Sequence, residues 1–112
     1  METTSLTELA AERLSAAKRS RAGRATSTVH GGSEASLRQV LLAFTAGHAL
    51  AEHERPGEAT LQVLRGSVRV TTPTGSLEAE EGDHLVLPFE RHGLTAVSDA
   101  VVLLTVSLPR TS

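Results

Sequence analysis

The sequence contains no cysteine, tryptophan or tyrosine, and phenylalanine occurs only twice in its 112 residues. The absence of cysteine excludes disulfides, thiolate metal sites and thiol nucleophiles. Because Phe44 and Phe89 are the only aromatic side chains, any cavity is walled mainly by aliphatic and small residues, with little surface on which a base or sugar ring could stack. The most apolar stretch, Val101–Val106, is far too short to span a bilayer.

Length and charge indicate a single globular domain with one modest core. The formal net charge is −2 and 39% of the residues are hydrophobic, which indicates neither disorder nor a surface that coats a polyanion. The N-terminus carries Glu2, Glu8 and Glu12 and no apolar run, so it does not resemble a secretory signal. We expect a cytoplasmic protein that binds neither nucleic acid nor membrane.

Residues 5–19 have the spacing of an amphipathic helix. Ser5 and Glu8 fit a capping box at its start, and Lys18 and Arg19 lie where the helix dipole favours cations. The apolar residues of this stretch recur on one side: Leu6, Leu9, Ala10, Leu14 and Ala17. We expect residues 1–25 to form an N-terminal helix and connector.

The connector continues the basic run of the helix end, with Arg21 and Arg24. Such a cluster could contact phosphate. Because the chain is acidic overall and no aromatic residues interleave, a solvated helix end is the favoured interpretation.

After Gly31-Gly32 the helical period gives way to short strand patterns. Turn residues separate these segments, which are Leu37–Phe44, Leu61–Thr72 with a bend at Gly66, Leu77–Ala79, His84–Pro88, Gly93–Val97 and Val101–Ser107. Short strands at even spacing with glycine and proline between them are typical of an antiparallel barrel or sandwich. The predicted fold class is therefore all-β, with a barrel over residues 26–112.

Two glycine-framed segments resemble motifs of the cupin family. The first family motif is glycine, five residues, His-x-His, three or four residues, glutamate, six residues and glycine. Gly47, His53 and Gly66 fit this frame, whereas Arg55 replaces the second histidine and Ala59 replaces the glutamate.

The second family motif is glycine, five residues, Pro-x-Gly, two residues, histidine, three residues and asparagine. Gly82 and Pro88 match it, Glu90 replaces the glycine, and His92 comes one residue early. The resemblance covers residues 37–107 and is nearest to short bacterial cupins without an assigned activity. It implies a double-stranded β-helix, or jelly-roll, barrel.

The resemblance also implies where a metal would bind. In cupins these motif positions hold a divalent transition metal such as iron, manganese, nickel or zinc, and only His53 and His92 carry over to this chain. Two imidazoles fall short of the three or four ligands that hold such a metal firmly. Glu58 lies one residue before the glutamate position and is the best replacement ligand. An inward Arg55 would repel a cation, so a weak or absent metal is favoured.

Several functions remain open from the sequence. The favoured one is a barrel that binds a small organic ligand through His53, Arg55 and His92, with Arg55 holding a carboxylate. The alternatives are a metal-assisted or histidine-based enzyme of isomerase or dioxygenase type, and an interaction or regulatory module. It is equally open that Arg55 faces solvent and the two histidines only hydrogen-bond within the barrel.

The resemblance finally implies association into a homodimer, through sheet faces or an exchanged N-terminal strand. Thr26–His30 is the candidate strand. Pairing of this kind would also protect an exposed strand edge.

Overall fold

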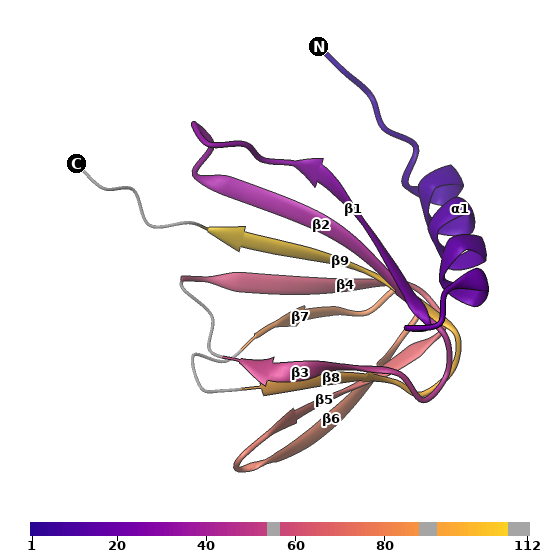
Figure 1. Cartoon of the computed structure of the whole chain (residues 1–112). Coiled ribbons are helices and arrows are strands. Elements are labelled where there is room, and N and C mark those ends of the chain that lie inside the picture. The colour runs from indigo at the N-terminus through magenta and orange to yellow at the C-terminus, as the bar shows by residue number, and fades with distance from the viewer. Residues whose placement is uncertain (54–56, 88–91, 108–112) are drawn as a thin grey trace.

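The computed structural model describes residues 1–53, 57–87 and 92–107, in which one helix, α1 (Leu6–Arg19), precedes nine strands (Figure 1). The strands are β1 (Arg24–His30), β2 (Leu37–Phe44), β3 (Ala49–His53), β4 (Ala59–Arg65), β5 (Ser67–Thr72), β6 (Gly75–Glu80), β7 (His84–Val86), β8 (His92–Ala96) and β9 (Ala100–Ser107). They form two antiparallel sheets, in the orders β1-β2-β9-β4-β7 and β3-β8-β5-β6. The predicted all-β fold with an N-terminal helix is confirmed.

Helix α1 begins and ends as its sequence predicts. The Ser5 hydroxyl accepts a hydrogen bond from the Glu8 N–H at 3.2 Å, which satisfies one of the unpaired donors of the first turn. Lys18 and Arg19 lie in the last turn, near the negative end of the helix dipole. The buried side of the helix consists of Ala10, Leu14 and Ala17. Within the described part of the chain, no helix is long and apolar enough to cross a bilayer.

The five-stranded sheet separates two hydrophobic cores. On its outer face, α1 packs against alternate residues of β2 and β9, including Leu41, Ala43 and Val101 (Figure 1). On its inner face, the neighbouring residues Leu42 and Phe44 belong to the core between the two sheets. The second half of β2 and the first half of β9 are therefore buried on both sides, which explains why Leu41–Phe44 and Ala100–Leu103 are continuous apolar runs.

Strand β4 shows the alternation that the sequence predicts. Ala59, Leu61 and Val63 are buried between the sheets, whereas Gln62 is exposed. Gly66 follows, at the predicted bend between β4 and β5, with a φ of 70° that side chains other than glycine rarely adopt. The bend carries the chain from the five-stranded sheet to the four-stranded one.

Candidate functional site

His92 is the first residue of β8 and lies inside the barrel. It is 6% exposed and is the one polar or charged residue counted as buried among those the structure describes. Leu94 and Ala96, two and four residues further along the same strand, belong to the core between the sheets. Since alternate residues of a strand share a face, His92 lies on the inner face of β8.

A small cavity surrounds His92. Its volume is about 30 Å³, and apart from His92 and Gly93 its walls are aliphatic: Leu42, Leu50, Leu61, Val70, Leu87, Leu94 and Leu104. A space of this size holds about one water-sized group. The cavity can therefore take one polar group of a ligand against the imidazole, but not a whole organic molecule.

The structure brings the backbones of His53 and His92 together. The two residues, 39 positions apart in the sequence, are direct partners in the antiparallel pairing of β3 with β8. The register of the pairing shifts between Leu50 and His53, which marks a bulge or irregularity in the pairing. The backbones of these two positions therefore meet. The side chain of His53 lies outside what the structure describes, so the role of His53 as a ligand stays a prediction.

Of the other residues predicted for the site, the structure describes Glu58 alone. Arg55, together with Pro88 and Glu90 of the second motif, lies outside the described residues. Glu58 is exposed and borders a surface groove beside Ser107, away from the walls of the His92 cavity. Its carbonyl oxygen accepts the Ser107 N–H at 2.9 Å, and its own N–H donates to the Ser107 hydroxyl at 3.2 Å.

The described side chains do not fit a firmly held metal. No group of three or more histidine, aspartate or glutamate residues with metal-ligand geometry occurs among them. Among the described residues of the cavity wall, His92 is the one nitrogen ligand, whereas transition metals in proteins are held by three or four ligands. We therefore derive no chemistry through a metal at this site.

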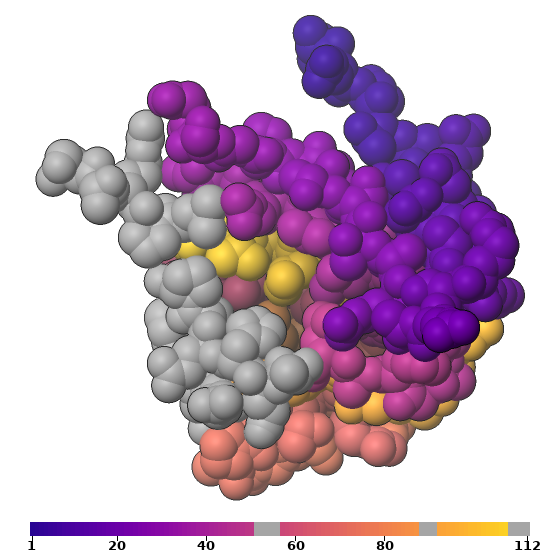
Figure 2. Space-filling view, in the orientation of Figure 1, coloured from indigo at the N-terminus to yellow at the C-terminus, as the bar shows by residue number. Residues whose placement is uncertain are grey.

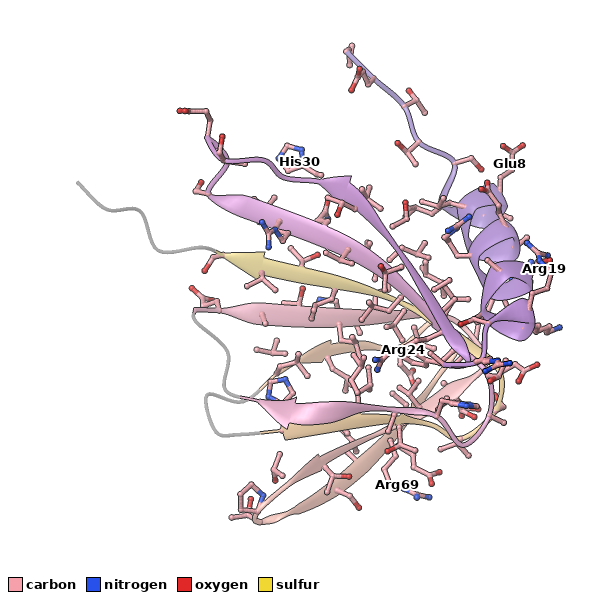
Figure 3. The ribbon with its side chains drawn as sticks, in the orientation of Figure 1. Glu8, Arg19, Arg24, His30 and Arg69 are labelled. Atoms are coloured by element: carbon pink, nitrogen blue, oxygen red, sulfur yellow. The ribbon has the colours of Figure 1, made fainter. Side chains whose placement is uncertain are left out.

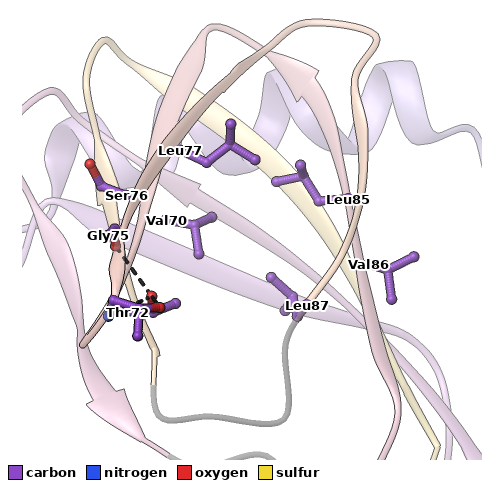
Figure 4. Close-up of a pocket in the computed structure, with 9 residues that line it drawn as sticks. Val70, Thr72, Gly75, Ser76, Leu77, Leu85, Val86 and Leu87 are labelled. Carbon is purple, nitrogen blue, oxygen red and sulfur yellow. Dashed lines mark hydrogen bonds between the residues drawn. The ribbon is translucent and has the colours of Figure 1, made fainter.

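A second, larger cavity opens beside the first and was not predicted from the sequence. It is a groove of about 290 Å³ between β5, β6 and β7, lined by Val70, Thr72, Thr74, Gly75, Ser76, Leu77, Leu85, Val86 and Leu87 (Figure 4). Val70 and Leu87 line both cavities. The space-filling view also shows the molecule hollowed between the two sheets, with β9 (yellow) visible inside (Figure 2).

Several charged side chains that do not line the His92 cavity contact other groups of the protein. Arg69 projects from β5 away from the opposite sheet and forms an ion pair with Glu78 (Figure 3). In the basic cluster, Lys18 lies 3.8 Å from a carboxylate oxygen of Asp99, and Arg24 donates to the Ala49 carbonyl oxygen at 3.4 Å. Arg19 donates to the Ser15 hydroxyl at 2.7 Å. These cations thus contact groups of the chain itself.

Comparison with known proteins finds similarity to solved structures. No protein-family model matches the sequence, and no curated protein matches it significantly. A conserved protein of unknown function from Streptococcus pyogenes superposes with a TM-score of 0.73 and 24% identity, over 82% of this chain and 80% of that one. An RmlC-like cupin protein from Desulfovibrio desulfuricans gives a TM-score of 0.71 and 26% identity, over 96% of both chains.

A third similar structure is a cupin superfamily protein from Desulfitobacterium hafniense, with a TM-score of 0.71 and 16% identity, over 77% of this chain and 78% of that one. Identities of this size support the shared fold and leave the activity open. The likeness to the Desulfovibrio protein extends over nearly the whole chain, so it includes the N-terminal helix as well as the barrel.

Proposed function

Because the chain has the fold of the small bacterial cupins, we propose that it binds a small organic ligand inside its barrel, with one polar group of the ligand in the cavity beside His92. The observation that supports this proposal is the buried His92 in an otherwise aliphatic cavity. Ligand sites are typically apolar spaces with a few polar groups that fix the orientation of the ligand. The wall of the His92 cavity has this composition.

The imidazole of His92 gives the site its specificity. In its neutral form it carries one donor and one acceptor nitrogen, so it can bind a hydroxyl, a carbonyl or an amide. Because the surrounding leucines exclude water, a hydrogen bond between His92 and the ligand is electrostatically stronger than the same bond in solvent. An imidazole can also donate or accept a proton, so the site could support proton transfer to or from a bound ligand.

The proposal is tested by screening small alcohols, ketones and amides while following the His92 ring by NMR. Ligands that bind in the barrel are expected to shift the His92 ring signals, and His92→Ala is expected to weaken binding roughly tenfold through the lost hydrogen bond. His84→Ala is the matched control, because His84 is an exposed histidine on β7. Equal weakening by both variants, or binding that leaves the His92 ring unchanged, would contradict the proposal.

Metal analysis of the purified protein separates ligand binding from the metal-assisted alternative. We expect less than one transition metal ion per chain, because His92 is the one metal ligand among the described residues of the cavity wall. Stoichiometric iron, manganese, nickel or zinc that is lost in His53→Ala would favour the metal-assisted enzyme instead.

We also propose that a second copy of the chain pairs along β1. The predicted strand Thr26–His30 is part of β1, which lies at one edge of the five-stranded sheet. Proteins block edge-to-edge pairing with charged residues and prolines on their edge strands. Between Arg24 and His30 this edge carries neither. Light scattering is expected to give a dimer at micromolar concentration and a monomer for Thr26→Lys. A wild-type chain that is monomeric under these conditions would contradict pairing along β1.

A further inference from the structure

The groove beside the His92 cavity lies where the two sheets end. Strand β7 is the last strand of the five-stranded sheet, and β6 is the last strand of the four-stranded one. The hairpin of β5 and β6 forms one wall of the groove and β7 forms the other (Figure 4). Leu77 on β6 is 56% exposed and Val86 on β7 is 74% exposed, so both sides of its rim are apolar.

The groove and the His92 cavity have two side chains in common. Val70 is 6% exposed and Leu87 is 4% exposed, and each contacts both spaces. They form a shared wall made of aliphatic side chains alone. Because these side chains have no polar partner to hold them in place, a rotamer change costs only packing, and the two spaces can join around one elongated molecule.

The lining of the groove selects the chemistry of that molecule. None of the described residues that line it carries a charge or an aromatic ring. Its polar groups are hydroxyls at the β5–β6 turn, where the Thr72 hydroxyl donates to the Gly75 carbonyl oxygen at 3.3 Å and lies 3.2 Å from the Thr74 hydroxyl (Figure 4). The remaining wall consists of leucine and valine, which suits a flexible aliphatic chain better than a flat ring.

We propose that the ligand is a linear aliphatic molecule with one uncharged polar head, and that its chain lies in the groove between β6 and β7 while the head contacts His92. This inference rests on the ligand-binding function proposed above and assigns the chemical class of the ligand. The groove of about 290 Å³ takes on the order of ten non-hydrogen atoms, at about 30 Å³ for a water-sized group.

Straight-chain primary alcohols test the proposal. Affinity is measured by NMR titration for n-butanol, n-hexanol, n-octanol and n-decanol, with benzyl alcohol as the flat-ring comparison. Each added methylene is expected to raise affinity about fourfold, as apolar surface is buried in the groove. Benzyl alcohol is expected to bind no better than n-butanol, and all of the alcohols are expected to shift the His92 ring.

Substitutions at the rim of the groove test where the alkyl chain of the bound alcohol lies. Leu77→Ser combined with Val86→Ser is expected to weaken n-octanol binding about tenfold while leaving n-butanol binding unchanged, because only the longer chain reaches the rim. Val97→Ser is the matched control, since Val97 is an exposed apolar residue, at 42%, that does not line the groove. Both rim positions are exposed, so the double variant is expected to fold. An NMR spectrum of its backbone amides, compared with that of the wild type, checks this.

The outcomes separate this inference from the function on which it rests. If alcohols shift the His92 ring with an affinity independent of chain length or of the rim variants, the aliphatic class is overturned and ligand binding stands. If long alcohols bind at the rim and leave the His92 ring unchanged, the continuous site is overturned. If no alcohol binds and the screen finds another ligand at His92, the inference fails alone; if nothing binds, both proposals fail.

Discussion

Replacing Gly66 with alanine is expected to lower the free energy of unfolding by about 3 to 4 kcal/mol. Two effects act at this position. The backbone φ of 70° is unfavourable for any residue with a Cβ atom, and a Cβ at Gly66 would overlap the carbonyl oxygen of Asp99. Since the obstacle is backbone, a change of side-chain rotamer cannot relieve it. Equilibrium unfolding in urea measures the effect.

Gly82→Ala is the matched control for this prediction. Gly82 also has a positive φ, of 93°, but no heavy atom lies within 4 Å of the position its Cβ would take. The control therefore retains the backbone penalty and lacks the overlap, and we expect a loss of about 1 to 2 kcal/mol. Equal losses in the two variants would show that the contact with Asp99 contributes nothing.

Truncation of Phe44 to alanine is expected to cost about 3 to 5 kcal/mol. Phe44 is 1% exposed and belongs to the core between the sheets, at the end of β2 where it pairs with Arg24 of β1 and Ala100 of β9. Removing its ring leaves a cavity that neighbours on two paired strands cannot close without breaking the sheet. Urea unfolding again measures the loss.

Two further substitutions test the cause of that loss. Phe44→Leu is expected to cost less than Phe44→Ala, because it leaves a smaller cavity. Val97→Ala, at a residue that is 42% exposed, is expected to change stability by less than about 1 kcal/mol. A Phe44→Ala variant as stable as Val97→Ala would contradict the assignment of Phe44 to the core.

The secondary structure could be predicted from sequence because its signals are local. The apolar spacing and the Ser5 N-cap of α1, the alternation around Gln62 in β4 and the bend at Gly66 each depend on a few neighbouring residues, and each is confirmed. The glycine-framed motifs singled out His53 and His92, whose backbones pair in the structure, whereas composition and periodicity alone do not relate these two positions.

The site was harder to predict because it depends on contacts between distant segments. His84 shares strand parity with the apolar Val86, a pattern that favours a half-buried face, yet both residues are exposed. Strand β7 has only three residues and pairs with β4 alone, so no strand lies along its other edge. The groove exists because β6 and β7 end different sheets, and no local pattern reports that arrangement.

The position of α1 has a consequence for signalling between the two faces of the sheet. Leu41 and Ala43 of β2 touch the helix side, and Leu42 and Phe44 touch the barrel side. A molecule that displaced β2 from within would therefore move the surface on which the helix rests, since close-packed interiors transmit strain. Strand β2, which borders the interior, thus links the binding of a molecule inside the barrel to the position of the helix outside it.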